Sequence, residues 1–305
     1  MTDAAAPAGP ALKRGVRLLD LVMLGAGTAI GAAIFTVLGP AAQVGGAGIL
    51  ITVALAALPM VLFALVYAFM ASAVPRTAAS FEWQRQFTHP VIAFAIVWMR
   101  VLSNAVVMIL LARVLVDYAS KVLPMPTAPV VFGMFTLIFA LNLVGVAVAA
   151  RTQTVLMLLL LVVFTVFVVS AAPGFRPQLF GEALAGGWLP IFAALPLMIQ
   201  LFLGIETATE VGEEVENSKT VVPLGVAGGL LLTVVVYVLM TFAAMSLVGP
   251  GGLAGSDAPL LTAAVTITGA AQRLSEVSAA VSSGASLPAR PPGPTRLMAA
   301  KVMRT

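Results

Sequence analysis

The chain of 305 residues contains no cysteine, which excludes a disulfide framework and a thiolate metal site. Charged residues make up only 9% of the sequence, whereas soluble globular proteins average about 25%. The single histidine, His89, lies in an expected loop. The chain also lacks a phosphate-binding loop, a nucleophile triad and metal-ligand spacing. We therefore expect neither an enzyme nor a protein with a metal or another cofactor.

Apolar residues dominate what is present. They make up 61% of the sequence, and the mean hydropathy is +1.09. This composition predicts an all-α integral membrane protein whose main surroundings are the lipid bilayer. The net charge of +4 does not indicate nucleic-acid binding, because the basic residues flank apolar segments. The oligomeric state stays open.

Seven segments reach the roughly 20 apolar residues that a helix needs to cross a membrane. An eighth begins near Ala258 and stays apolar only to about Ala271. The bias of Lys and Arg between alternate loops predicts a cytoplasmic N-terminus. The seven segments are residues 18–38, 49–74, 91–118, 130–149, 154–172, 189–209 and 221–248.

These segments divide the chain into four expected parts. Residues 1–17 form a cytoplasmic arm, and residues 18–172 hold the first five spans. Residues 189–271 hold spans six and seven and the start of span eight. Residues 272–305 are rich in Pro and Arg and cannot span a bilayer. We expect this tail to be the degraded or frame-altered end of a truncated copy of a longer protein.

Two spans carry helix-breaking residues. The first contains Gly25, Gly27 and Gly31, and the sixth contains Pro190, Pro196 and Gly204. Glycine disfavours a helix interior by about 1 kcal/mol relative to alanine, and a backbone group freed in hydrocarbon must find a partner or line a cavity. Interrupted spans five apart are typical of transporters built from inverted repeats.

Interrupted helices suit a zwitterionic ligand. The N–H groups that begin one half-helix attract a carboxylate, and the carbonyls that end another attract an ammonium group. A free α-amino acid carries both charges on one carbon. The pattern therefore predicts an amino acid, or a related amine, as the ligand.

The same residues resemble the amino acid permeases of the amino acid–polyamine–organocation superfamily. Their first span follows the pattern G-x-G-x-x-I-G-x-G-I-F, which this chain matches from Gly25 to Phe35, except that Ala33 replaces a glycine. The run from Pro75 to Phe81 is similar to P-R-S/T-G-G-S-Y, and the run from Phe202 to Glu206 to F-x-G-x-E. The resemblance covers about residues 15–270.

The resemblance implies the fold of the bacterial sodium-coupled leucine transporter, a LeuT-like five-plus-five inverted repeat. Here it would be incomplete, with about 7–8 transmembrane helices, the first repeat whole and the second partial. It also implies that Glu206 serves proton-linked gating. The break in the first helix is expected at Gly25 and Gly27, from the glycines themselves. The implied substrate-binding residues are Ile30, Gly31, Ala32 and Ala33 for the carboxylate, and Phe202, Leu203 and Gly204 for the amino group.

Three polar residues within the spans are further candidates. Glu206 is an intramembrane carboxylate, a default functional candidate. Arg100 lies deep enough to pair with Glu206 or an anionic substrate, although its side chain can also extend to the interface. Asn104 offers a hydrogen bond to substrate or to a neighbouring helix. The acidic residues after span six, which we expect on a solvated cytoplasmic face, are Glu213, Glu214 and Glu216.

Two function classes follow. The first is a secondary transporter that moves amino acids across the cell membrane by alternating access, with polyamines or other organic amines as the alternative substrates. The second is a non-transporting membrane remnant or partner protein. Proton coupling, exchange and facilitated diffusion all remain open. A channel has little support, because no span carries a regular polar stripe.

Overall fold

A computed structural model describes residues 15–31, 33–122, 126–174, 176–256, 259–267 and 269. Its contacts define one unit from Met1 to Ala263 and another from Ala264 to Thr305, and the description that follows concerns the first. The α-helices are α1 (Leu18–Ile30), α2 (Ala33–Gly45), α3 (Ile49–Ala73), α4 (Ala79–Phe87), α5 (Pro90–Val122), α6 (Thr127–Val144), α7 (Val146–Ala171), α8 (Gln178–Ala185), α9 (Trp188–Gln200) and α10 (Ser218–Ala254). Short 3-10 helices are η1 (Gly46–Gly48), η2 (Ala172–Gly174), η3 (Ile205–Thr209) and η4 (Gly212–Glu214).

Six helical stretches of the described chain are long and apolar enough to cross a membrane. The expected first span is divided, because α1 ends at Ile30 and α2 begins at Ala33. The expected boundary between residues 149 and 154 is wrong. α6 ends at Val144, Gly145 adopts a φ of 127°, and α7 continues unbroken from Val146. Glycine tolerates the positive φ at Gly145, so the chain turns there. The turn between the two spans therefore lies nearer the N-terminus than the composition suggested.

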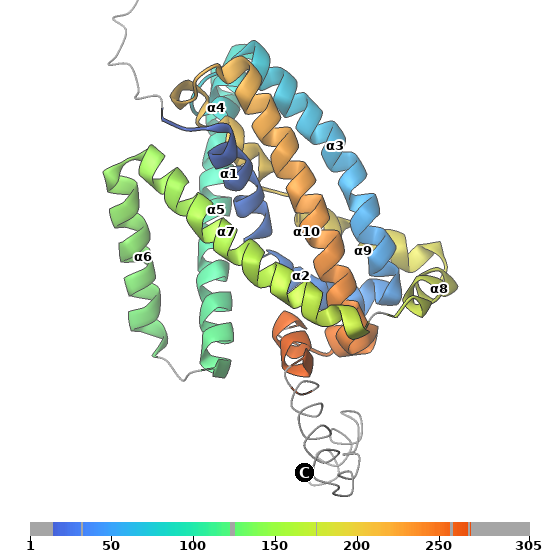
Figure 1. The fold of residues 1–305 in the computed structure, drawn as a ribbon. Helices are drawn as coiled ribbons and strands as arrows, with labels where there is room; N and C mark the ends of the chain where they lie inside the picture. Colours follow the sequence, from blue (N-terminus) through green and yellow to red (C-terminus); the bar gives the residue numbers. More distant parts are fainter. Residues whose placement is uncertain are drawn as a thin grey trace, which may run out of the picture. The chain divides into compact units, whose positions relative to one another are not determined.

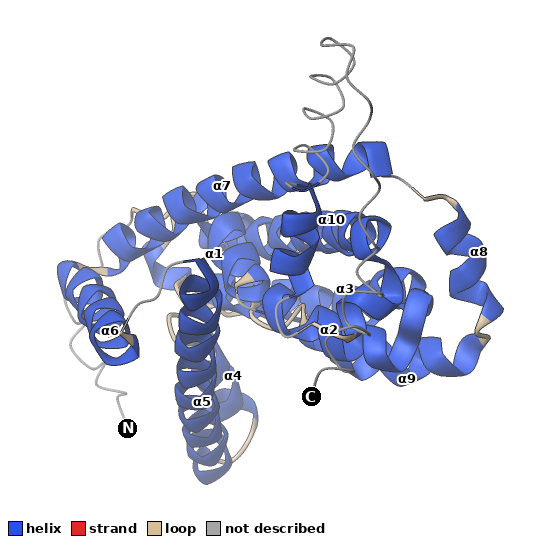
Figure 2. Cartoon of the chain, turned by 90° about the horizontal axis from the view of Figure 1, so that it is seen from below, coloured by secondary structure: helices blue, strands red, loops and turns tan. Residues whose placement is uncertain are grey.

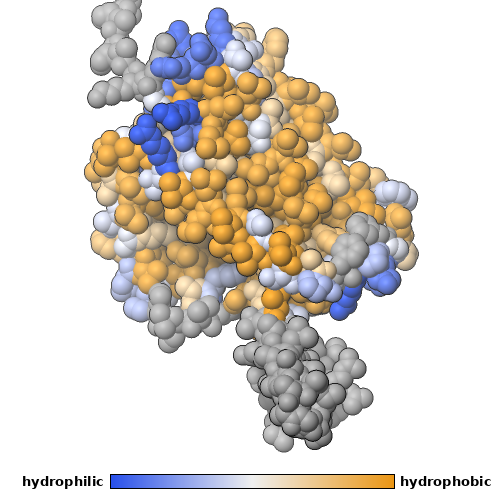
Figure 3. All heavy atoms as spheres, in the orientation of Figure 1, coloured by the Kyte–Doolittle hydropathy of each residue, from blue (hydrophilic) through white to orange (hydrophobic). Residues whose placement is uncertain are grey.

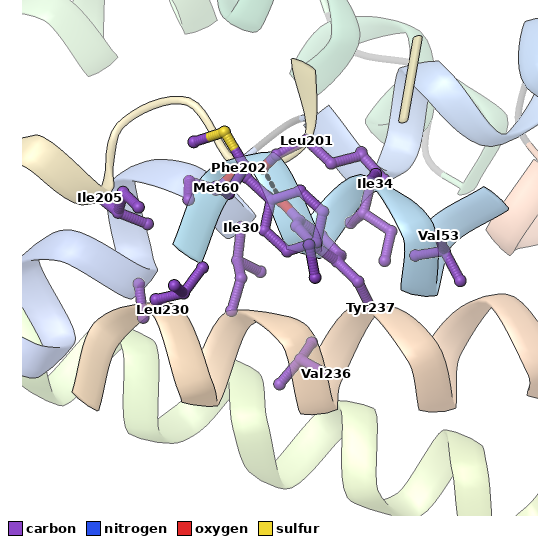
Figure 4. Packing of buried hydrophobic residues seen from close by; sticks show 14 of the residues in the cluster. Ile30, Ile34, Val53, Met60, Leu201, Phe202, Ile205, Leu230, Val236 and Tyr237 are labelled. Atoms are coloured by element: carbon purple, nitrogen blue, oxygen red, sulfur yellow. Dashed lines mark hydrogen bonds between the residues drawn. The ribbon is translucent and has the colours of Figure 1, made fainter. Parts of the chain in front are cut away.

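The core lies where α1, α3, α9 and α10 pack together. Figure 4 shows buried side chains of α1, α2, α3, α10 and the segment after α9, and Tyr237 of α10 lies among them, fully buried. Figure 2 shows α7 lying over α1 and α10, and α7 contacts both helices. This arrangement surrounds the break between α1 and α2 with packed helices.

α5 and α6 contribute little to that core. α6 has no buried residue among those described, and its Phe132 and Leu143 are more than two-thirds exposed, at 75% and 73%. In Figure 1 both helices stand to one side of α1 and α10. Exposed apolar helices are the expected state in lipid, where no water opposes apolar surface.

Candidate functional site

The first helix break lies between α1 and α2. Gly31 closes α1 with a φ of 3° and a ψ of −123°, and its N–H donates to the Gly27 carbonyl at 3.0 Å. Ala32 lies outside the described residues. The first N–H groups of a helix have no intrahelical acceptor, so those at the start of α2, from Ala33 onward, need acceptors outside the helix.

The expected break at Gly25 and Gly27 is wrong, because both residues lie inside the regular helix α1. Their lack of a side chain serves close packing instead. A Cβ on Gly25 would lie 3.0 Å from the Ile205 carbonyl oxygen, and one on Gly27 would collide with the Gln153 amide. The glycines therefore let η3 and α7 approach the α1 backbone.

The second break follows α9. Gly204 adopts a left-handed φ of 115° before η3 begins at Ile205. Its N–H donates to the Glu206 Oε2 atom at 2.8 Å. A residue with a Cβ would be strained here, because L-residues disfavour this region. Of the expected neighbours, Phe202 is fully buried, whereas Leu203 is 53% exposed.

The two breaks cross in contact. A Cβ on Gly204 would lie 2.8 Å from the Thr28 Cγ2 atom and 3.0 Å from the Ala29 nitrogen. On the same side of α1, Gly25 meets Ile205. The structure thus brings together the ends of two interrupted helices that lie far apart in sequence.

Tyr237 of α10 forms hydrogen bonds to the backbone at both helix breaks. Sequence reasoning missed this role. Its hydroxyl lies 2.6 Å from the Ala29 carbonyl oxygen and 2.7 Å from the Leu201 carbonyl oxygen, and donates to both. In an unbroken helix these carbonyls would accept from residues four positions later. The Tyr237 ring also packs edge-on against Phe202, with ring centroids 5.3 Å apart (Figure 4). The only signal in the sequence was a phenol within an otherwise apolar span.

A charge cluster lies beside the second break. The Arg100 guanidinium is 2.9 Å from the Glu210 Oε1 atom and 3.8 Å from the Glu206 Oε1 atom. It also donates to Ser80 of α4, whose hydroxyl donates to Glu210. Tyr67 of α3 faces the same groups. The sequence pointed to Arg100 and Glu206 but missed Ser80 and the sharing of one guanidinium by two carboxylates.

Asn104 is placed differently from the other candidates. It lies one turn beyond Arg100 on α5 and is exposed. No hydrogen bond of its amide occurs among the described residues. Within the described part of the chain, no hydrogen bond therefore links Asn104 to either break.

The N-terminal arm covers the acidic segment after η3. Gly15 and Val16 donate backbone hydrogen bonds to the Glu214 carbonyl, at 3.1 and 3.3 Å. Glu214 is buried, with 8% of its surface exposed, so the expectation of a solvated position is wrong for this residue. Burial raises the pKa of the Glu214 carboxyl above its ordinary value. Glu216 is exposed, as expected.

The loop between α3 and α4 covers the same segment. The Ala78 N–H donates to the Glu210 carbonyl at 3.0 Å, and Arg76 forms an ion pair with Glu213 at 3.2 Å. The backbone of Gly212 packs directly against this loop, because a Cβ on Gly212 would lie 3.0 Å from the Arg76 carbonyl oxygen. We call residues 210–215 the crossing segment, since it joins the arm to the loop.

Comparisons with known proteins agree with this arrangement. A sequence profile of the family described as amino acid permease matches residues 16–287. The branched-chain amino acid permease BcaP of Bacillus subtilis is 27% identical over 273 residues, which cover 82% of this chain and 58% of that protein. The chloroplastic cationic amino acid transporter 9 of Arabidopsis thaliana is 26% identical over 290 residues, covering 84% and 49%. The methylthioribose transporter of Bacillus subtilis is 24% identical over 250 residues, covering 75% and 54%.

The chain spans about half the length of the curated relatives that it matches. The family profile nevertheless covers most of this chain, which confirms the resemblance seen in its motifs. The apolar helices also confirm the predicted all-α, multi-pass membrane architecture. The chain belongs to the amino acid permease family.

Proposed function

We propose that this chain is a secondary transporter that binds a free amino acid at the two crossed helix breaks and moves it by alternating access. The observation that carries the proposal is the contact of Gly204 with Thr28 and Ala29. It brings the end of α1, which α2 follows from Ala33, beside the turn that follows the end of α9. The start of α2 and the end of α9 carry opposite partial charges, and such a pair complements a zwitterion.

Each break recognises a different charged group of the substrate. The backbone from Ile30 to Ala33 holds the carboxylate, because the N–H groups at the N-terminus of α2 have no intrahelical acceptor. The carbonyls of Phe202, Leu203 and Gly204 hold the amino group at the end of α9. Organic amines without a carboxylate are the alternative substrates, and they would use the second break alone.

Glu206 and Arg100 connect this site to gating. Glu206 accepts from the Gly204 N–H and also contacts the Arg100 guanidinium. A change in charge at Glu206, such as protonation, therefore acts directly on the second break. We propose that a coupling proton binds in this way.

The relatives' names support an amino acid as the substrate class. One is named a branched-chain amino acid permease and another a cationic amino acid transporter, whereas a third is named for methylthioribose. The crossed breaks favour the amino acids. We further propose that the protein lies in the cell membrane with a cytoplasmic N-terminus, which the basic residues of the arm support.

Binding to the chain tests the proposal directly. We expect a panel of free amino acids to raise the midpoint of thermal unfolding in detergent. Gly204→Ala should weaken the binding of the stabilising amino acid at least tenfold, because the Cβ would strain a left-handed position and strike Thr28. Gly133→Ala is the matched control, since a Cβ there meets no atom within 4 Å.

Counterflow of the bound amino acid in proteoliposomes then tests transport. Saturable exchange in the parent chain, lost in Gly204→Ala and retained in Gly133→Ala, would support the transporter. Binding without exchange would favour a non-transporting membrane protein. Absence of any ligand-induced stabilisation by a folded parent chain would contradict the proposed site.

A further inference from the structure

An open cavity lies where α1 and α7 begin. Its volume is about 400 Å³, and it is lined by Arg17, Leu19, Asp20 and Arg151. The two helices are fastened together beside it, because the Thr154 hydroxyl donates to the Asp20 Oδ1 atom at 2.9 Å. The cavity is distinct from the crossed breaks and from the charge cluster.

Two of the charged side chains that line the cavity are arginines that can bind a ligand. The side chains of Arg17 and Arg151 are exposed, and neither forms an ion pair or hydrogen bond within the described part of the chain. The Asp20 carboxylate is already engaged through both oxygens, with Thr154 and with the Arg17 N–H at 3.1 Å. Two free guanidinium groups in one cavity favour an anion with several acceptor oxygens, such as a phosphate.

Apolar surface continues from the cavity along α7. Val155 and Leu159 follow Arg151 at intervals of four residues, so all three lie on one face of the helix. These two side chains are 65% and 61% exposed, and Leu19 in the cavity wall is 52% exposed. Figure 3 shows hydrophilic atoms at the end of the molecule where α1 begins, bordered by a broad hydrophobic surface. A ligand that fits a basic cavity followed by an apolar surface carries an anionic head and an apolar tail.

We propose that this cavity binds the phosphate of an anionic phospholipid, with Arg17 and Arg151 on the headgroup. The acyl chain lies along Val155 and Leu159. Basic pockets between transmembrane helices bind anionic headgroups. Here Arg17 directly precedes α1, and Arg151 lies in the second turn of α7. The proposal is independent of transport and of any amino acid ligand.

Lipid binding to the full chain tests it. The purified protein is mixed with phosphatidylglycerol and phosphatidylcholine, and bound lipid is counted by native mass spectrometry at several lipid concentrations. Arg17→Gln/Arg151→Gln should lower the preference for phosphatidylglycerol by about 30-fold, from about 1 kcal/mol for each basic residue. Arg151→Gln alone should lower it about fivefold, which keeps the test open if the double variant does not fold.

Two controls show whether the preference arises at this cavity and requires a lipid. Arg176→Gln removes an exposed arginine outside the cavity and should keep the full preference. Inorganic phosphate alone should not displace phosphatidylglycerol at equal concentration. An unchanged preference in the double variant, an equal loss in Arg176→Gln, or displacement by inorganic phosphate would each overturn the lipid assignment.

Discussion

At the scale of single residues, Tyr237 is the side chain on which both helix breaks depend. Tyr237→Phe keeps the ring that packs on Phe202 but leaves the Ala29 and Leu201 carbonyls without their donor. A buried polar group without a partner costs about 1–3 kcal/mol. We therefore expect a loss of that order in the free energy of unfolding, measured by denaturant titration in detergent.

Tyr118→Phe is the matched control for this variant. Its hydroxyl donates to the Phe35 carbonyl at 3.1 Å, and the residue is only half-buried. Removing it should cost less than removing the Tyr237 hydroxyl. Equal losses in the two variants would contradict a special role for Tyr237.

Glu214 gives a second residue-scale prediction, based on pH. Burial raises its pKa in the folded state above the ordinary value of 4.5, so the folded protein binds the proton more tightly than the unfolded chain. Its contribution to stability is therefore complete below about pH 4.5 and is lost as the pH rises through the raised pKa. Glu214→Gln should remove this loss, so that the variant is more stable than the parent at pH 7.

The unfolding midpoint at several pH values measures this effect. The advantage of Glu214→Gln should shrink as the pH falls from 7 to 4. The exposed Glu216 supplies the control, because Glu216→Gln should show no such dependence. A constant difference between Glu214→Gln and the parent at every pH would contradict the assignment.

At the scale of elements, the crossing segment 210–215 connects the N-terminal arm with the loop before α4. Gly212→Ala would press a Cβ against the Arg76 backbone, at 3.0 Å from its carbonyl oxygen. We expect the loop to shift away and the Ala78 N–H to lose its bond to Glu210. Hydrogen exchange at residues 76–79 should become faster by about tenfold, which corresponds to about 1.4 kcal/mol of local opening.

Gly251→Ala controls for the loss of a glycine as such, since a Cβ at that position has open space. Exchange at residues 76–79 should stay at the parent rate in this variant. If Gly212→Ala leaves exchange unchanged as well, the loop and the crossing segment are not coupled.

Elements were easier to predict from sequence than the contacts between them. The glycines of the first span indicated an interrupted helix, because glycine weakens helix interiors wherever it occurs. Composition could not distinguish Gly31, where the chain breaks, from Gly25 and Gly27, which only admit neighbouring backbone. That difference depends on which helix packs against each position.

The same limit applies to the candidate site. Arg100 and Glu206 were recognisable because charge within an apolar span is costly and needs a partner. Ser80 and Tyr237 were not, since a single hydroxyl carries no such signal. The Glu210 partner of Ser80 lies 130 residues away along the chain, and the two partners of Tyr237 lie 208 and 36 residues away. Only the folded arrangement reveals such pairs.

At the scale of the whole molecule, the orientation of the chain in the membrane can be tested by labelling its loops. The chain contains no natural cysteine, so single introduced cysteines give an unambiguous signal. In intact cells we expect a membrane-impermeant maleimide to label Gln178→Cys, at the start of α8, and not Thr88→Cys, after α4. Both positions are exposed, so burial does not distinguish them. The reverse labelling pattern would place the N-terminus outside.

The unequal lengths of α6 and α7 have a consequence for the bilayer itself. α6 has 18 residues and α7 has 26, or about 27 Å and 39 Å of helix at 1.5 Å per residue. A hydrocarbon layer about 30 Å thick matches α6 standing upright, whereas α7 fits only when tilted. Figure 1 shows α7 oblique to α6, with the left-handed Gly145 at their junction. Changes in bilayer thickness would therefore be absorbed by the inclination of α7, while the short α6 sets the thickness at which the protein is least strained.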